Sequence, residues 1–213
     1  MNKNTIELIP GYFYHIFNRG INQDKIFLKE ENYHYFLRKY DEYFSDFADT
    51  YSYCLLPNHF HLLVRIKDSD KKDSIFGKEK MDLSERKKME SFSKAKKNAS
   101  EQLRRFFISY SMSINKQEKR MGSLFIKNFK RKAILNDNNL LSVIYYIHHN
   151  PVHHKLTINI ENYKWSSYLS ILSDKPSKLA KEFILDYFGG KENFMEFHNQ
   201  NHDEKEFESL LIE

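Results

Sequence analysis

The sequence predicts an α+β fold in which helices pack on the faces of a central antiparallel sheet. Three observations support this prediction: the chain has the length of one ordinary domain, it is rich in aromatic residues, and its segments follow the order β-α-β-β-α-β-α. Of 213 residues, 40% are hydrophobic and 15% aromatic, which is ample for a packed core. With only 6 Gly and 4 Pro, collagen-like, coiled-coil and wholly disordered chains are excluded.

The first half of the chain predicts three strands and one helix. Residues 12–18 form a short aromatic segment bounded by glycines, which is typical of a strand. Residues 29–47 predict an amphipathic helix, because apolar side chains recur there at spacings of three and four: Tyr33, Phe36, Leu37, Tyr40 and Phe44. Residues 51–56 and 59–67 predict two further strands. A Pro-Asn turn joins them, and so short a connection makes them antiparallel.

The second half predicts a longer helix, a strand and further helices. Residues 68–82 are expected to be a charged, mobile loop, and residues 83–114 a long helix with one apolar stripe. Residues 124–135 predict a strand with basic residues interleaved. Residues 138–149 predict a helix that stops just before Pro151, because helical backbone is disfavoured for the residue preceding a proline. The rest of the chain is expected to be helical and peripheral.

Domain organisation and location follow from composition. We divide the chain into a main domain, residues 1–173, and an acidic helical extension, residues 174–213. No run of 18 apolar residues is present and the N-terminus lacks a signal-peptide pattern, so no membrane contact is expected. The single cysteine, Cys54, cannot form an internal disulfide. These features predict a cytoplasmic protein.

Charge is distributed unevenly along the chain. Residues 71–132 hold 19 Lys and Arg against 7 Asp and Glu, a net charge of +12, whereas residues 174–213 hold 5 against 10, a net charge of −5. A basic block of this size favours a polyanionic partner such as nucleic acid. The alternative is a solvated, lysine-rich helical surface.

Two histidines follow the Pro-Asn turn. Because side chains alternate in a strand, His59 and His61 project from one face while Phe60 points into the core. Two imidazoles on one face are half of a metal site. Taken alone, the pattern favours an edge strand with two half-exposed histidines.

A second polar pair lies on the last strongly predicted helix. Tyr146 and Asn150 are four residues apart, so they are neighbours on one helix face, together with His149. Tyr145 lies about 100° away, beside the apolar stripe. A phenol and an amide side by side suit a nucleophile and an oxygen ligand of one metal. Taken alone, the pair favours a surface tyrosine and an ordinary Asn-Pro helix end.

Together, these separated motifs resemble the single-tyrosine HUH transposases (named for a histidine-hydrophobic-histidine motif), in particular their REP-associated branch. The similar segments, in chain order, are GYFYHIFNRG, YSYCLLPNHFHLLVRIK, YYIHHNPVHHKL and YKWSSY. They extend from Gly11 to Tyr168. The resemblance implies the ferredoxin-like sheet of HUH endonucleases, single-stranded or hairpin DNA as the partner, and a monomer or homodimer.

The resemblance also implies roles for four residues. His59 and His61 match the histidine pair, Asn150 matches the third metal ligand, and Tyr146 matches the tyrosine that attacks a DNA phosphodiester to form a 5′-phosphotyrosine. The implied cofactor is a divalent metal, Mg²⁺ in the cell. Two imidazoles suit Mn²⁺ better than Mg²⁺, so tighter Mn²⁺ binding is expected.

Contacts to the DNA backbone are expected from the basic block. Lys and Arg neutralise phosphates and make affinity depend on salt, without reading sequence. The candidates are Arg104, Arg105, Lys127, Lys130, Arg131 and Lys132. Three neighbouring aromatic residues can stack on bases, although their helical spacing favours core packing: Phe106, Phe107 and Tyr110.

Three other classes of function remain open. A rolling-circle initiator or relaxase shares the histidine pair, but the sequence holds no P-loop pattern of an attached helicase. A catalytically idle DNA- or RNA-binding regulator derived from a transposase would keep the basic surface without the chemistry. A structural zinc module has least support, because it needs four closed ligands.

Overall fold

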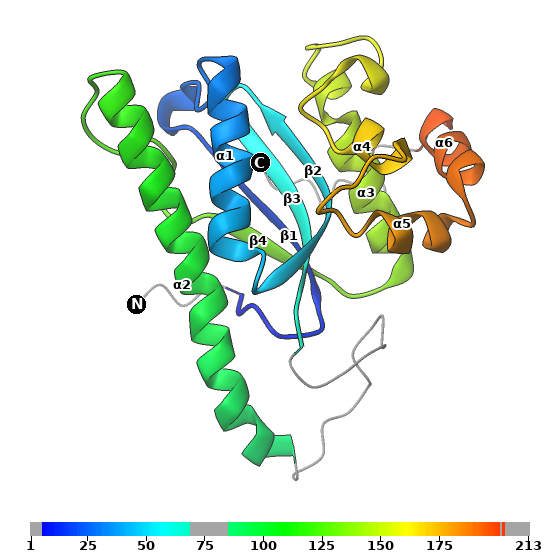
Figure 1. Cartoon of the computed structure of the whole chain (residues 1–213), viewed down its shortest axis with the longest axis horizontal. Coiled ribbons are helices and arrows are strands. Elements are labelled where there is room, and N and C mark those ends of the chain that lie inside the picture. The colour runs from blue at the N-terminus through cyan, green and yellow to red at the C-terminus, as the bar shows by residue number, and fades with distance from the viewer. Residues whose placement is uncertain (1–5, 69–84, 201, 203–213) are drawn as a thin grey trace.

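The computed structural model describes residues 6–68, 85–200 and 202, and only the backbone of residues 85–98. Figure 1 shows a sheet with helices on both sides. In chain order the elements are β1 (Phe13–Arg19), η1 (Ile21–Gln23), α1 (Glu30–Phe44), β2 (Ala48–Leu56), β3 (His59–Ile66), α2 (Glu85–Gln117), β4 (Lys130–Ile134), α3 (Asp137–His153), η2 (Ile160–Asn162), α4 (Tyr168–Leu172), α5 (Lys181–Phe188) and α6 (Lys191–Asn199).

The sheet has the topology that the sequence predicts. Its four strands lie in the order β2-β3-β1-β4, and each neighbouring pair is antiparallel. With α1 and α2 as the two connecting helices, this is the ferredoxin-like arrangement. The predicted fold class is therefore confirmed. Strand β3 lies inside the sheet, where it pairs with β1 on one side and β2 on the other.

Each face of the sheet has its own core, because side chains alternate along the strands. Helices α1 and α2 cover one face, and α3 with the C-terminal helices covers the other (Figure 1). On β1, for example, Tyr14 and Ile16 belong to the first core, whereas Phe13 belongs to the second. Phe60 of β3 is fully buried in the first core, as predicted.

The aromatic stripe of α2 lies in the core and not on a binding surface. Phe106 and Tyr110 are fully buried, and Phe107 is 7% exposed. The Tyr110 hydroxyl donates a hydrogen bond to the Ile26 carbonyl at 2.8 Å, which satisfies its polar end inside the protein. The core interpretation of these three residues is confirmed.

The last strand is shorter than predicted. Strand β4 covers only Lys130–Ile134, and the expected strand start is a loop. Leu124 and Phe125 are buried beneath α2, and Phe125 makes only an isolated bridge to Gly20. Asn128 has a positive φ of 63°, which no strand residue adopts. The hydrophobic residues here serve the core without extending the ladder.

The helix with the tyrosine pair is longer than predicted. It continues through Pro151 to His153, whereas the sequence places its end before the proline. Pro151 lacks a backbone donor but lies close to the C-terminus, where the His154 amide closes the helix onto the Asn150 carbonyl at 3.0 Å. Both Asn150 and Pro151 are buried. Tertiary burial therefore outweighs one lost helical bond.

Smaller differences concern element ends. Helix α1 ends at Phe44 and not at residue 47, because the chain turns there to begin β2 at Ala48. The expected charged loop, residues 68–82, lies outside the described residues except for Asp68.

Residues 174–200 contain the helices α5 and α6, which belong to the same core as α3. Ile184 of α5 and Phe194 of α6 are fully buried in the second core. The Ala180 amide also bonds to the Thr50 carbonyl of β2 at 2.8 Å. This part of the acidic extension therefore shares a core with the residues before it.

A buried hydrogen-bond chain joins α6 to α3. His198 Nδ1 donates to the Phe194 carbonyl, so its Nε2 accepts from His148 Nδ1 at 2.8 Å. His148 Nε2 in turn accepts from the Ser167 hydroxyl at 2.8 Å, and that oxygen accepts from the Tyr53 amide. Burial lowers the pKa of both imidazoles, so both are neutral, and each proton in the chain then has one place.

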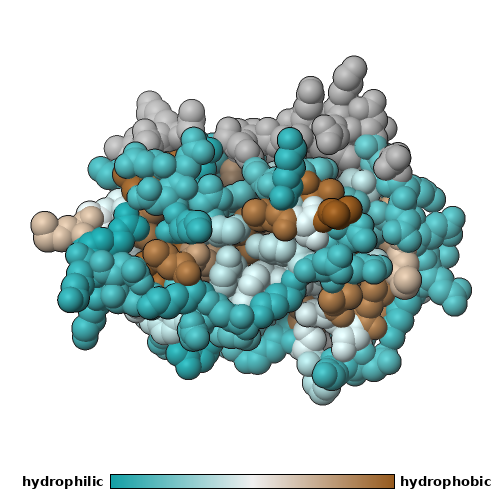
Figure 2. All heavy atoms as spheres, turned by 90° about the horizontal axis from the view of Figure 1, so that it is seen from above, coloured by the Kyte–Doolittle hydropathy of each residue, from teal (hydrophilic) through white to brown (hydrophobic). Residues whose placement is uncertain are grey.

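The surface carries hydrophobic side chains in separate patches. Figure 2 shows several of them on one face, divided by hydrophilic residues. Such scattered exposure is ordinary in folded proteins. Within the described ranges, no helix combines the length and the apolar character needed to cross a membrane.

The histidine chain predicts loss of stability in acid. Burial lowers the pKa of His198 to about 3, from 6.5 in the unfolded chain. Between these values only the unfolded chain binds the proton, so the free energy of unfolding falls as pH falls, by up to about 1.4 kcal/mol per pH unit for this group. Denaturant unfolding at pH 7.5 and 5.0 measures the slope.

His198→Gln removes the titrating group and is expected to make that slope shallower. Met195→Gln places the same side chain on α6 without removing a histidine, and should keep the wild-type slope. An unchanged slope in His198→Gln contradicts the prediction.

Candidate functional site

The histidine pair lies at the start of the interior strand β3 and faces α3. His59 is 8% exposed and His61 is 2% exposed, and their ring centroids are 5.2 Å apart. Because β3 is an interior strand, the alternative of an edge strand with half-exposed histidines is wrong. Buried imidazoles at this position need polar partners.

Helix α3 supplies those partners from about 90 residues further along the chain. Asn150 Oδ1 lies 3.2 Å from His59 Nε2. The ring of Tyr146 meets that of His61 edge-on, with centroids 5.3 Å apart. The four residues matched by resemblance are therefore together in space. Tyr146 is 3% exposed, so it faces the sheet and not the solvent.

Tyr145 points elsewhere, although it is adjacent in sequence. Its ring stacks on His149 with centroids 3.9 Å apart, and its hydroxyl donates to the Gln200 carbonyl at 3.3 Å. His149 was expected on the face of Tyr146. The structure places it against Tyr145 instead, because these two residues are four apart and share a helix face, and its Nε2 donates to the His198 carbonyl.

The polar atoms around His59 are suited to binding a cation. Its Nδ1 lies 2.7 Å from Asn58 Oδ1 and its Nε2 lies 3.2 Å from Asn150 Oδ1. A neutral imidazole has one N–H and can donate to only one of these oxygens. If the Asn150 amide is turned around, its nitrogen can donate to His59 Nε2, but its oxygen then loses the contact with His59. A cation between His59 Nε2 and Asn150 Oδ1 satisfies both.

Two further buried atoms support this fit. Among the described residues, His61 Nε2 and Asn150 Nδ2 have no hydrogen-bond partner. Burial lowers the pKa of His61 well below its usual value, which keeps the imidazole in the neutral form that binds metals. In the described part of the chain, no group of three or more His, Cys, Asp and Glu residues is arranged to hold a metal, so the set rests on two imidazoles and one amide.

Sequence analysis missed a third buried imidazole in the site. His15 of β1 is 1% exposed, and its Nε2 lies 2.9 Å from His61 Nδ1. Its ring also meets that of Tyr146 edge-on at 6.0 Å. The signal was a polar residue between Phe13 and Phe17 on one face of an aromatic strand. Its partner became known only with the strand register, which sets Phe17 opposite His61.

A cavity of about 290 Å³ opens beside the histidine pair and is lined by basic residues. Arg19, Lys127 and Lys130 line it together with His59, His61 and His154. His154 lies against His59, with ring centroids 4.6 Å apart. Lys132 lies opposite His15 in the register of β1 and β4. The three predicted lysines are therefore on the side of the sheet that carries the site.

The three predicted arginines lie on the α2 side. Arg104 and Arg105 both form ion pairs with Glu101, at 2.7 and 3.1 Å. Arg131 donates to the Ser100 hydroxyl and lies over the Phe129 ring, and burial lowers its pKa. The structure does not bring these arginines to the histidine pair.

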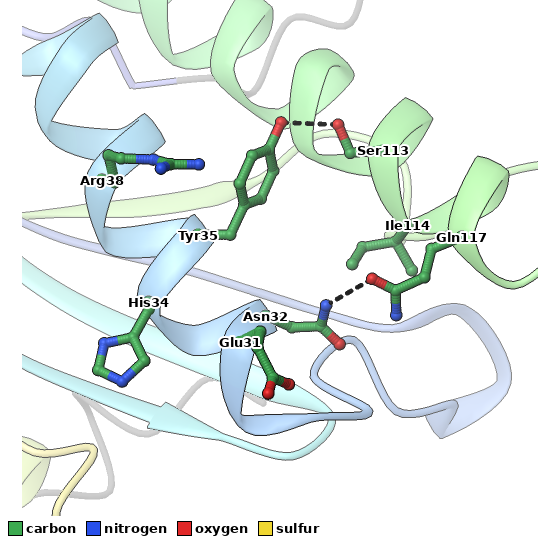
Figure 3. Close-up of a pocket in the computed structure, with 8 residues that line it drawn as sticks. All are labelled: Glu31, Asn32, His34, Tyr35, Arg38, Ser113, Ile114 and Gln117. Atoms are coloured by element: carbon green, nitrogen blue, oxygen red, sulfur yellow. Dashed lines mark hydrogen bonds between the residues drawn. The ribbon is translucent and has the colours of Figure 1, made fainter.

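A second hollow lies between α1 and α2. Figure 3 shows its lining, in which the Tyr35 hydroxyl bonds to that of Ser113 and Asn32 donates to Gln117. Its volume is about 490 Å³. It lies on the sheet face opposite α3, and none of the predicted site residues line it. We therefore assign the site to the smaller cavity, where the chemistry converges.

Comparison with known proteins addresses the fold. No protein-family model matches the sequence, and no curated protein matches it. A solved structure of a REP-associated tyrosine transposase bound to a REP hairpin is similar, with a TM-score of 0.54 and 14% sequence identity. The similarity covers 83% of this chain and 89% of that chain. The resemblance that the motifs predict is thus confirmed at the level of the fold.

Proposed function

We propose that this protein is a metal-dependent single-stranded DNA endonuclease and strand transferase, of the transposase kind, that acts at DNA hairpins through a 5′-phosphotyrosine. The observation that carries the proposal is the convergence of Tyr146 and Asn150 of α3 on His59 and His61 of β3. The fold of a hairpin-binding tyrosine transposase supports it.

The reaction is a transesterification. The Tyr146 oxygen attacks the phosphorus of a phosphodiester and forms a phosphotyrosine bond, while the bond to the 3′ oxygen breaks. The phenol loses its proton, and the departing oxygen takes one up to become a 3′-hydroxyl. Because one ester replaces another, the step is reversible, and a different 3′-hydroxyl can take the DNA strand without ATP.

The buried site prepares Tyr146 for this step. A phenol has a pKa near 10 and is a weak nucleophile at neutral pH, so position and nearby positive charge matter. His59, His61 and Asn150 would hold the divalent metal, which when bound supplies a Lewis acid for the scissile phosphate. The rings of His15 and His61 fix the orientation of the Tyr146 ring. Two imidazole ligands favour Mn²⁺, and Mg²⁺ is the proposed cellular ion.

The basic cavity suits the DNA backbone. Lys127 and Lys130 are exposed and line the cavity that holds the histidine pair. Their charges would place phosphates near the site without reading bases. Arg104 and Arg105 already pair with a carboxylate, so we assign them a smaller share of DNA binding.

Removing single hydroxyl groups tests the nucleophile. Tyr146→Phe keeps the ring that packs on His61 and should fold normally, but form no covalent adduct with labelled hairpin DNA and Mn²⁺. Tyr145→Phe, the matched control, loses the bond to the Gln200 carbonyl and should form the adduct. Denaturing gels detect the product. An adduct that persists in Tyr146→Phe and disappears in Tyr145→Phe refutes the assignment. No adduct in the wild-type protein favours the idle DNA-binding regulator.

Removing single imidazoles separates chemistry from binding. We expect His59→Ala and His61→Ala to abolish cleavage, while hairpin affinity measured by fluorescence anisotropy changes less than about threefold. The histidines would hold the metal that acts on the scissile phosphate, whereas the lysines would provide most of the attraction to the DNA backbone. If affinity and cleavage fall together, these histidines maintain the fold instead.

Salt dependence tests the lysines. Each lost phosphate contact should reduce the slope of log affinity against log salt by about 0.7 for a single strand. The double variant of Lys127→Ala and Lys130→Ala should therefore reduce it by about 1.4. The matched double variant of Arg104→Ala and Arg105→Ala should reduce it less, because Glu101 already offsets those charges. Equal slopes in the two variants contradict this placement of the DNA.

A further inference from the structure

The ring of the buried histidine on β1 contacts Tyr146, but its ring nitrogens have no role in the reaction described so far. His15 lies in a row of aromatic side chains, stacked on Phe17 with ring centroids 4.8 Å apart. It is 1% exposed, and among the described residues its Nδ1 has no hydrogen-bond partner. A phenylalanine here would avoid the cost of burying an unpaired polar atom. An imidazole in this place therefore calls for a function.

His15 makes one hydrogen bond, and that bond goes to a candidate metal ligand. Its Nε2 lies 2.9 Å from His61 Nδ1, and the two rings lie nearly parallel at 24°. A neutral imidazole carries one proton on one of its two ring nitrogens, so in this pair one nitrogen donates and the other accepts.

Two arrangements of these protons are possible. If His15 Nε2 donates, His61 carries its own proton on Nε2 and cannot bind a metal through that atom. If His61 Nδ1 donates to His15 Nε2, His61 Nε2 is a buried lone pair that has no hydrogen-bond partner among the described residues. Only the second arrangement makes His61 a ligand.

We propose that His15 is a positioning residue, which accepts the Nδ1 proton of His61 and so holds that imidazole in its metal-binding tautomer and orientation. The inference deepens the proposed function and rests on its assignment of His61 as a metal ligand. Partners of this kind usually are carboxylates, carbonyls or water, and they tune metal affinity by 10- to 100-fold. Here an imidazole from the neighbouring strand takes that place.

Substitutions at His15 distinguish its role as acceptor of the His61 proton from its role in packing. His15→Phe keeps an aromatic ring and removes the acceptor, whereas His15→Gln keeps an amide oxygen at about the reach of Nε2. Tyr14→Phe is the matched control: it also removes a polar atom from a buried ring of β1, but on the opposite face, where the hydroxyl accepts from the Ile9 amide.

Mn²⁺ titration of the full chain without DNA, followed by electron paramagnetic resonance, measures metal affinity. We expect a 10- to 100-fold loss in His15→Phe, partial recovery in His15→Gln and no change in Tyr14→Phe. His59→Ala tests the metal site itself, so failure of the proposed function is visible separately. Wild-type affinity in His15→Phe overturns the inference, as does an equal loss in His15→Phe and His15→Gln.

The tautomer of His61 is a second readout, and it needs neither metal nor activity. Imidazole ¹⁵N–¹H correlation spectra of the metal-free protein should show the His61 proton on Nδ1. In His15→Phe the proton should move toward Nε2. A proton on Nε2 in the wild-type protein, or the same tautomer in both proteins, overturns the inference even where Mn²⁺ binding fails.

Discussion

Packing of α3 on the second face of the sheet is the contact on which the rest of the site depends. The helix buries Leu140, Val143, Ile144 and Ile147 against the strands. This apolar contact brings Asn150 to His59 and Tyr146 to His61. Because the two groups of residues lie about 90 positions apart, no local preference can place them together. Hydrophobic burial, which has no direction of its own, thus sets the position of a directional polar site.

The C-terminal helices strengthen that contact from the outer side. Their buried side chains extend the second core, and the chain from Ser167 through His148 to His198 fixes the rotation of α3 by hydrogen bonds. A buried polar chain tolerates little displacement, because each lost bond leaves an unsatisfied group. Helix α6 also packs against the ring of Tyr145, so that only Tyr146 of the two tyrosines is directed to the sheet.

The site is buried at its centre and basic at its mouth. The imidazoles of His15 and His61 contact the ring of Tyr146, while Lys127 and Lys130 line the cavity outside. This arrangement suits a reaction on a phosphodiester. In the proposed reaction, the charges at the mouth would attract the DNA backbone over a distance, and the buried ring atoms would provide fixed geometry at the scissile bond.

The sequence alone determined the fold class and the strand pair around the Pro-Asn turn, because alternation and helical period are local properties. The four candidate residues were named by the resemblance of its motifs to a known family. The sequence also distinguished Tyr146 from Tyr145, since their angle is fixed by the helix. Only the tertiary structure decided that β3 is an interior strand, that α3 runs through Pro151, and that the lysines and arginines lie on opposite sides of the sheet. His15 escaped detection for the same reason. Its role depends on which strand pairs with β3 and in which register, and that pairing is set by long-range packing.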